Sequence, residues 1–240
     1  MPKLSRGQRA GAVFALLVAL ASAVGLSLRA RHGAEAAPAS LFHVPRVDEE
    51  PNFDGELAED MWRNHAHGAK GFLDERGRLA APFSDVHLAW RGDKLLIGLY
   101  AADWNVRTTR SSSEPGSVDD ADRFLIELRV GDRVYRTAID PAGAVLEAPC
   151  DVGRTCVPAA EWVPRLVIGH DSDGTLNNAK DFDEEWMLEI GIPFSAIGLS
   201  SGPGSRFEAR FARCDVPRNR VQVCSSFPGR EQAIELVIDR

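Results

Sequence analysis

The stretch EWMLEIGIPFSAIGL, residues 185–199, decides the fold class of this chain. Trp186, Leu188 and Ile190 occupy alternate positions in a run of apolar residues, which predicts a strand over 186–192 with one buried face. Pro193 cannot continue a strand ladder, and residues 194–198 follow it with the length of one helical turn. The stretch therefore predicts a half-buried strand followed by a tight turn.

Two hairpins are expected on the N-terminal side of this stretch. Residues 86–90 and 94–102 read as strands joined through Gly92-Asp93, and residues 123–130 and 133–139 as strands joined through Gly131-Asp132. Glycine followed by Asp suits the two-residue turns that close antiparallel hairpins.

Further short strands are expected along the chain at 41–47, 165–169, 207–213, 221–224 and 234–238, which makes about ten in all. Helical signal is limited to residues 56–64 and 194–198. Many short strands separated by Gly and Pro turns predict an all-β fold, an antiparallel sandwich of two sheets of jelly-roll or immunoglobulin type with one or two helical turns.

Composition narrows the possible partners. The chain has 240 residues, 35 acidic and 28 basic, with a net charge of −7. Nucleic acid is not expected as a partner, because phosphate neutralisation by basic side chains supplies most of that affinity. Anionic lipid is disfavoured for the same reason. Residues 37–240 are expected to form a single domain that works as a monomer.

Residues 1–36 are predicted to comprise a signal peptide or N-terminal membrane anchor and a linker. Lys3, Arg6 and Arg9 precede the uncharged apolar stretch 11–28, as in a signal peptide. Ala21-Ser22-Ala23 suits cleavage, which we favour slightly, while the apolar stretch is also just long enough to remain as a membrane anchor. The domain is therefore expected outside the cytoplasm, as a periplasmic, secreted or membrane-anchored protein.

Export makes the four cysteines candidates for disulfides. Three connectivities are possible. We favour Cys150–Cys156 and Cys214–Cys224, because each pair closes a short loop between strand-like segments; free buried thiols are the alternative. Zinc is not expected, because there is no Cys-x-x-Cys pair and no histidine at ligand spacing.

Five stretches, in order, resemble one family. Residues 53–62 hold an Asp-Gly turn a few positions before Trp62, residues 85–103 read as strand, hairpin, strand and acidic residue, and residues 119–127 and 135–143 fit the next two strands. Residues 185–199 are similar to the run W-x-x-E-x-x-I-P-F-S-x-L-G of the family-nine carbohydrate-binding modules and their relatives. The resemblance covers residues 44–239.

The resemblance implies a β-sandwich related to DOMON domains. It implies an exported, non-catalytic protein that recognises a poly- or oligosaccharide in carbohydrate catabolism. In the sugar-binding members the saccharide lies between aromatic side chains, with polar groups on the ring hydroxyls.

The tryptophans divide into two groups. Trp62, Trp90 and Trp186 are expected to pack in the core. Trp104 and Trp162 lie among polar residues at strand ends or in loops, where an aromatic face would stay open to a sugar. Asp103 and Arg107 are expected to supply rim contacts. The alternative is that each of these two rings only covers a loop.

The strand over residues 135–140 departs from the family. Sugar-binding members carry an Arg and an Asn there, and the matching positions in this chain hold Ala138 and Asp140. Arg136 has the same parity as Ala138 and is expected to substitute for the missing arginine. Arg136 and Asp140 therefore join the predicted ligand-binding residues.

Other functions receive less support. No nucleophile elbow, zinc-protease motif or phosphate loop is present, and no pair of carboxylates is singled out for glycoside hydrolysis. Asp119, Asp120 and Asp122 are the candidate for a structural calcium site, with a solvated acidic turn as the alternative. The competing function classes are a structural or adhesive envelope domain without a small ligand, and a haem-binding DOMON-type electron carrier with axial ligands on an inner sheet face.

Overall fold

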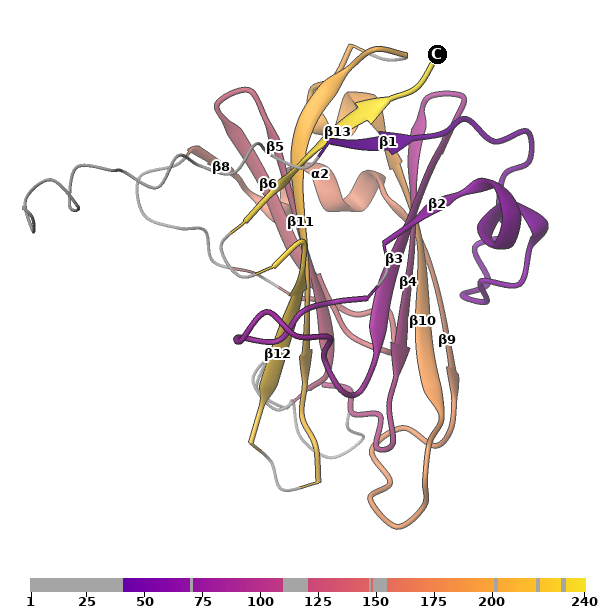
Figure 1. Ribbon diagram of the computed structural model, residues 1–240, viewed down its shortest axis with the longest axis vertical. Coiled ribbons are helices and arrows are strands. Elements are labelled where there is room, and N and C mark those ends of the chain that lie inside the picture. Colours follow the sequence, from indigo (N-terminus) through magenta and orange to yellow (C-terminus); the bar gives the residue numbers. More distant parts are fainter. Residues whose placement is uncertain are drawn as a thin grey trace, which may run out of the picture. The chain divides into compact units, whose positions relative to one another are not determined.

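The computed structural model describes residues 41–69, 71–109, 121–146, 148, 155–200, 203–218, 221–229 and 232–240 (Figure 1). The chain divides into two compact units, 1–39 and 40–240, and all described residues belong to the second. The predicted signal or anchor over residues 1–36 lies outside the described residues. Within them, no helix has the length and apolar character needed to span a membrane.

The described chain forms two sheets packed face to face (Figure 1). The five-stranded sheet has the order β2 (His67–Gly68), β3 (Ser84–Arg91), β4 (Lys94–Ala102), β10 (Glu185–Pro193) and β9 (Val167–Asp173). The eight-stranded sheet has the order β1 (Leu41–Val44), β13 (Ile234–Ile238), β11 (Arg206–Asp215), β5 (Arg123–Val130), β6 (Arg133–Ile139) and β7 (Val145–Leu146), with β12 (Val223–Phe227) paired to β11 and β8 (Thr155–Val157) paired to β6. The predicted all-β sandwich is confirmed.

Both predicted hairpins are present, β3–β4 in one sheet and β5–β6 in the other. Most strand pairs are antiparallel, as expected, and two pairs are parallel: β1 with β13 and β8 with β6. Each of these pairs joins strands that no hairpin connects, so turn residues could not predict their direction.

The short helices only partly match the expectation. The π-helical turn η1 (Met61–His65) overlaps the predicted stretch 56–64 and ends one residue beyond it, and the 3-10 turn η4 (Phe194–Ile197) falls inside the predicted stretch 194–198. The helix α2 (Ala159–Trp162) and the turn η3 (Val163–Arg165) were not predicted, since four and three residues are too few for a helical period to show.

The core lies between the sheets. Trp186, Leu188 and Ile190 are fully buried, as their alternation predicted, and the Trp186 ring centroid lies 4.7 Å from that of Phe124 on β5. Trp62 and Trp90 are also buried.

A second, smaller core lies on the outer face of the five-stranded sheet, where Val47, Met61 and Trp62 pack on Ala89 and Leu96. The segment 53–65 covers half of this outer face. A Cβ at Gly98 of β4 would lie 2.8 Å from Leu57 Cδ2, and one at Gly169 of β9 would lie 2.2 Å from the Phe53 carbonyl oxygen. Glycine at these positions therefore lets the segment lie directly on the strands.

Glu189 fastens that segment to β10. Its Oε1 accepts a hydrogen bond from Trp62 Nε1 at 2.7 Å, and its Oε2 accepts one from the Gly55 amide at 2.8 Å. Burial raises the pKa of Glu189 to about 7, although these two hydrogen bonds favour the charged form.

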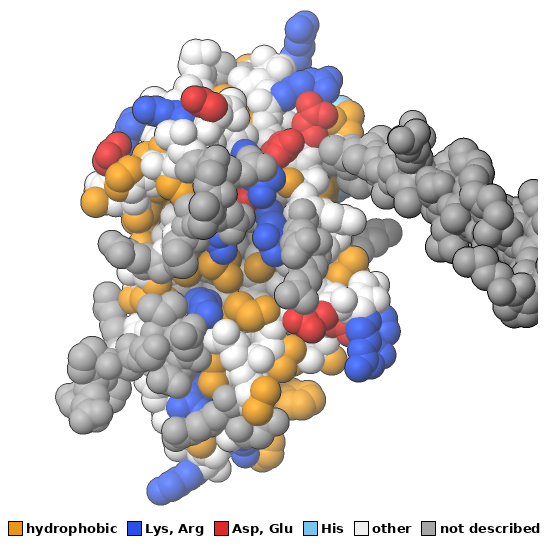
Figure 2. Space-filling view, turned by 90° about the vertical axis from the view of Figure 1, so that its left-hand side faces the viewer, with side chains coloured by type: hydrophobic (Ala, Val, Ile, Leu, Met, Phe, Trp, Pro, Cys, Tyr) orange, Lys and Arg blue, Asp and Glu red, His pale blue; other side chains and the backbone are white. Residues whose placement is uncertain are grey.

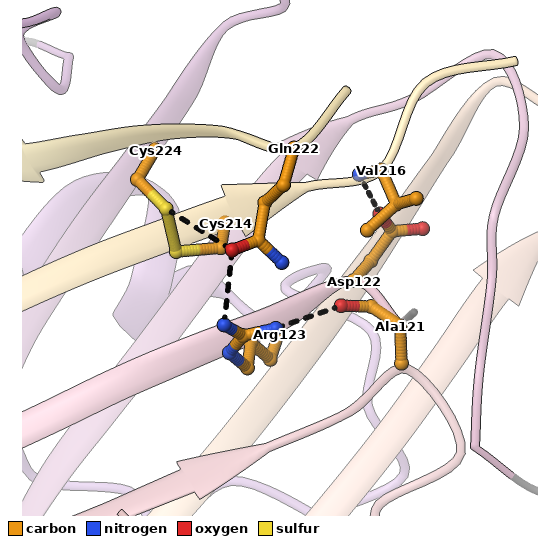
Figure 3. Close-up of a disulfide and its surroundings, with 7 residues drawn as sticks. All are labelled: Ala121, Asp122, Arg123, Cys214, Val216, Gln222 and Cys224. Carbon is orange, nitrogen blue, oxygen red and sulfur yellow. Dashed lines mark hydrogen bonds between the residues drawn. A yellow bond between two sulfur atoms is a disulfide. The ribbon is translucent and has the colours of Figure 1, made fainter. Parts of the chain in front are cut away.

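The predicted disulfide Cys214–Cys224 is confirmed and joins β11 to β12 at directly opposed positions (Figure 3). Arg123 lies beside it, donating to the Ala121 carbonyl and to Gln222 Oε1, each at 3.2 Å. Cys156 is also disulfide-bonded, but Cys150, its predicted partner, lies outside the described residues.

The outer face of the eight-stranded sheet is rich in arginine. Figure 2 shows Lys and Arg side chains beside hydrophobic ones on this side of the molecule. Arg129 and Arg136 both contact Glu127 across β5 and β6, at 2.6 and 3.6 Å. Arginines on this face therefore have partly paired, half-buried charges.

Candidate functional site

An aromatic groove lies at the end of β4, where the chain leaves the five-stranded sheet. Trp104 is 68% exposed and Phe182 is 77% exposed. Both line a groove of about 410 Å³, and its other walls are Ala81, Pro82, Asp103, Asn105, Asp215, Pro217, Arg218 and Val223. The Arg218 guanidinium lies over the Phe182 ring, 4.4 Å from its centroid, and donates to the Asp181 carbonyl. Aromatic area is therefore available next to charged hydrogen-bonding groups.

The loop that carries Trp104 is held by an unusual set of bonds. Five consecutive backbone amides, of residues 105–109, each donate to a side-chain oxygen; in chain order the acceptors are Asp103, Asp183, Asp122, Asn177 and Asp140. These bonds measure between 2.6 and 3.1 Å. Because the acceptors come from several elements, the loop following Trp104 is fixed to the body at every residue.

Arg213 of β11 lies under this region and is 2% exposed. It donates to Asp103 Oδ2 at 2.7 Å, to Asp215 Oδ1 at 3.1 Å and to the Ala102 carbonyl at 2.7 Å. Since β11 belongs to the eight-stranded sheet and Asp103 follows β4 of the five-stranded sheet, the arginine joins the two sheets.

Asp122 completes a buried group of three carboxylates with Asp103 and Asp215, whose oxygens lie within 4.8 Å of one another. Burial, together with the nearby Asp103 carboxylate, raises the pKa of Asp122 to about 8, although hydrogen bonds from the Val216 and Arg107 amides lower it. Burial also raises the pKa of Asp215 to about 6, although the Arg213 charge lowers it. The group therefore holds protons that the same side chains would lose in water.

The structure distributes the predicted ligand-binding residues over several places. Asp103 and Trp104 line the groove together. Arg107 lies in the adjacent loop, with its Nε buried and without a hydrogen-bond partner. Arg136 lies on the outer face of the eight-stranded sheet beside Glu127.

Asp140 is fully buried and supports the loop. Its carboxylate accepts hydrogen bonds from Thr108 Oγ1 at 2.5 Å, from the Thr109 amide and hydroxyl at 3.1 and 2.8 Å, and from the amides of Ala142 and Ala144 at 3.0 and 2.8 Å. These bonds occupy both of its oxygens.

The prediction that the Trp162 ring stays open at the surface is wrong. Trp162 is 1% exposed, and its ring lies edge-on to Tyr135, with 5.7 Å between centroids. The short helices α2 and η3, which were not predicted, direct the ring into the sandwich. They are too short to give a helical period in the sequence, so the sequence did not indicate the direction of the ring.

The predicted calcium ligands lie only partly within the described chain. Asp119 and Asp120 lie outside the described residues. Asp122 accepts hydrogen bonds from Val216 N and Arg107 N, each at 2.6 Å, so each of its oxygens already has a donor (Figure 3 shows the Val216 bond). Calcium bound to Asp122, Asp103 and Asp215 would have to compete with those donors and with Arg213.

Haem would need axial ligands such as Met or His on an inner sheet face, but Met187 and His87 face away from the main core. Met187 lies opposite Tyr100, and His87 lies opposite Gly98, on the outer face of the five-stranded sheet. Met61 is buried in the smaller outer core. This arrangement differs from a pair of axial ligands on an inner face.

Phe182 and Arg218 were missed by the sequence reasoning. Phe182 stands between aspartates in a loop, and Arg218 follows Pro217 beyond β11. An isolated aromatic residue in a polar loop is the one signal that distinguishes Phe182, and it applies equally to Trp104.

Comparisons with known proteins were made against family models, curated proteins and solved structures. No family model matches the chain. No curated protein matches it either. A solved structure of a candidate carbohydrate-binding protein from Bacteroides uniformis superposes with a TM-score of 0.56 at 20% identity, covering 84% of this chain and 100% of that chain.

Two further structures are similar. A family-nine carbohydrate-binding module from Caldicellulosiruptor kristjanssonii in complex with cellotriose has a TM-score of 0.54 at 13% identity, covering 83% of this chain and 94% of that chain. A family-nine module from the same organism in complex with glucose has a TM-score of 0.52 at 13% identity, covering 84% and 97%. The chain has a family-nine carbohydrate-binding module fold. The domain predicted from residues 44–239 thus has the architecture that the sequence motifs implied.

Proposed function

We propose that this protein is an exported, non-catalytic carbohydrate-binding protein that holds a saccharide in the groove between Trp104 and Phe182. The observation that carries the proposal is the exposure of these two rings on one groove, with Trp104 directly before a loop whose backbone is bonded at every residue from 105 to 109. A sugar presents C–H groups on its faces and hydroxyls at its rim, so it suits flat aromatic area beside polar groups. The rigid loop reduces the entropy that binding would otherwise cost.

The polar partners in this groove are Asp103, Asp215 and Arg218. Arg213 already bonds both carboxylates, so their orientation is set before a ligand arrives. Arg218 is the exposed charged group of the three and can donate hydrogen bonds to sugar hydroxyls. The saccharide complexes of two structural neighbours support this class of ligand.

Export and lack of catalysis belong to the same proposal. The apolar stretch 11–28 behind basic residues supports export. The Cys214–Cys224 disulfide supports an oxidising compartment. Cell fractionation with sequencing of the mature N-terminus tests the location.

Isothermal titration of the full-length protein with glucose, cellotriose and a panel of polysaccharides tests the binding proposal. We expect saturable binding, with an affinity that falls by about tenfold or more in Trp104→Ala and in Phe182→Ala. A loss of this size is typical when one buried aromatic contact is removed from an interface. Val167→Ala, which changes an exposed apolar side chain on β9, is the matched control and is expected to bind as the wild type does. No binding across the panel by the folded protein would favour a structural or adhesive domain instead.

A further inference from the structure

A second cavity lies elsewhere, on the outer face of the five-stranded sheet. Its volume is about 680 Å³. Asp85, Tyr100, Met187 and Asp171 are directly opposed on β3, β4, β10 and β9, so they form one row across four neighbouring strands. This row lies on the part of the outer face that the segment 53–65 leaves uncovered.

The segment itself forms one wall. Leu57, Trp62 and Arg63 line the cavity from above the sheet. Glu189 holds Trp62 and Gly55 in place, one row along the strands from Met187. The cavity is therefore built by a fixed covering segment and not by the side chains of a flat sheet alone.

The lining is acidic. Five carboxylates face the cavity against one permanent cation, Arg63; the five are Glu56, Asp85, Asp171, Asp173 and Glu185. His87 contacts Asp85, with 3.4 Å between Nε2 and Oδ2, while Asp85 Oδ1 is buried and has no hydrogen-bond partner. The excess of carboxylates over permanent cations in this lining favours a positively charged ligand.

Tyr100 lies in the middle of this row, close to two of the carboxylates. Burial raises its pKa to about 12, and its hydrogen bond to Glu185 and the charges of Glu185 and Asp85 contribute to the shift. A negative potential at the centre of the row favours a positively charged ligand.

The aromatic rings suit the same ligand. Phe83 is 41% exposed, and its ring centroid lies 6.3 Å from that of Tyr100. Both residues line the cavity, and an exposed aromatic ring can attract an organic cation and pack against its carbon atoms. A divalent metal fits less well, because the described carboxylates whose oxygens gather in threes belong to other places, Asp103–Asp122–Asp215 and Asp54–Glu59–Glu189.

We propose that this cavity binds an organic cation whose primary ammonium group is held by Asp85 and Glu185 and whose carbon body packs on Tyr100, Phe83 and Met187. This goes beyond saccharide binding in the Trp104 groove and does not depend on it. The ammonium group can belong to an amino sugar or to a lysine side chain, and the two sources are separated by the test.

Isothermal titration of the full-length protein provides the test. Glucosamine is compared with neutral N-acetylglucosamine, and Nα-acetyl-lysine methylamide with the uncharged norleucine analogue. We expect at least one ammonium probe to bind, its neutral counterpart to bind at least about tenfold more weakly, and Asp85→Asn to weaken the ammonium probe by a similar factor. Asp132→Asn, in the exposed β5–β6 turn, is the matched control and is expected to bind as the wild type does.

The outcome for each probe identifies the source. Binding of glucosamine alone indicates that the ligand is an amino sugar. Binding of the lysine probe alone indicates a basic peptide, and binding of both indicates that the cavity recognises the primary ammonium group that they share. Glu185→Gln repeats the test if Asp85→Asn does not fold. The proposal is overturned if neither ammonium probe binds, if the neutral probes bind equally well, or if the folded variants bind like the wild type. Trp104→Ala is expected to bind the ammonium probe as the wild type does. Failure of the saccharide proposal can therefore be distinguished from failure of the ammonium proposal.

Discussion

Arg213 and Asp103 join the two sheets through a hydrogen bond of 2.7 Å between two side chains that are almost completely buried. Asp103 is the residue before the exposed Trp104, so this bond sets the base of the aromatic groove. Arg213 also bonds Ser84 Oγ at 3.0 Å and the Ala102 carbonyl at 2.7 Å. The arginine therefore serves both the sandwich and the groove.

Replacing Arg213 by Met removes the partner of two buried carboxylates. We expect the free energy of unfolding to fall by about 3–5 kcal/mol, the cost of breaking a buried ion pair from one side. Urea denaturation measures the loss. Arg206→Met, which breaks the exposed pair with Glu235, is the control and should cost less than about 1 kcal/mol. Equal losses in the two variants would contradict a special role for Arg213.

The buried carboxylates Asp122 and Asp215 should make stability depend on pH. Their folded pKa values, about 8 and about 6, lie above the ordinary 3.8, so the folded state holds protons that the unfolded state has released. This contribution is complete below about pH 4 and is lost as the pH rises through about 6 and about 8, with a slope of at most about 1.4 kcal/mol per pH unit for each proton. Thermal unfolding between pH 5 and pH 9 measures it.

Asp215→Asn separates the two groups. Asparagine can still accept from Arg213 and can donate to Asp103, as protonated Asp215 does. We expect this variant to lose less stability than the wild type between pH 5 and pH 7. An unchanged pH profile would show that Asp215 does not hold its proton.

Asp140 should act on the Trp104 loop without touching a ligand. Asp140→Ala leaves the amides of Thr109, Ala142 and Ala144 and two hydroxyls without their acceptor. We expect a loss of about 3 kcal/mol in the free energy of unfolding, and faster hydrogen exchange at residues 105–109. Asp132→Ala in the exposed β5–β6 turn should change neither. Wild-type rates of hydrogen exchange at residues 105–109 in Asp140→Ala would show that Asp140 does not stabilise the loop.

Glu189 should control the covering segment over the five-stranded sheet. Glu189→Leu leaves Trp62 Nε1 and the Gly55 amide without an acceptor, at a cost of about 2–4 kcal/mol. Hydrogen exchange should increase in residues 53–62 more than in β10 itself. Glu208→Leu, at an exposed position on β11, should cost less than about 0.5 kcal/mol. A uniform increase in exchange would show that Glu189 supports the whole fold instead.

Local patterns predicted most of the strands. The bounds of β4, β5, β6 and β13 agree with the expected ranges, because alternation and Gly-Asp turns act between neighbours in the sequence. The same locality explains what these patterns did not show. The parallel pairs β1–β13 and β6–β8 join distant segments, and the direction of the Trp162 ring depends on two turns too short to show a period.

The candidate site was only partly visible in the sequence. Trp104 and Asp103 were identified from their position at a strand end. Asp140 was predicted to bind saccharide and Asp122 to bind calcium, whereas the structure shows both carboxylates accepting hydrogen bonds from backbone amides. Counting carboxylates cannot show which amide each one will meet, since Asp140, Asp122 and Asp183 converge on one loop from separate parts of the chain.

The sequence by itself determined the all-β class, the two hairpins, the Cys214–Cys224 disulfide and the similarity of motifs to the family-nine modules, because hydrophobic period, turn residues and motif spacing are local properties. The tertiary structure alone decided that Trp104 and Phe182 line one groove, that Arg213 bonds both Asp103 and Asp215, and that an acidic cavity opens beside the segment 53–65. Those relationships depend on which strands pair and in what register, and register is set by the packing of the whole sandwich and not by any one stretch.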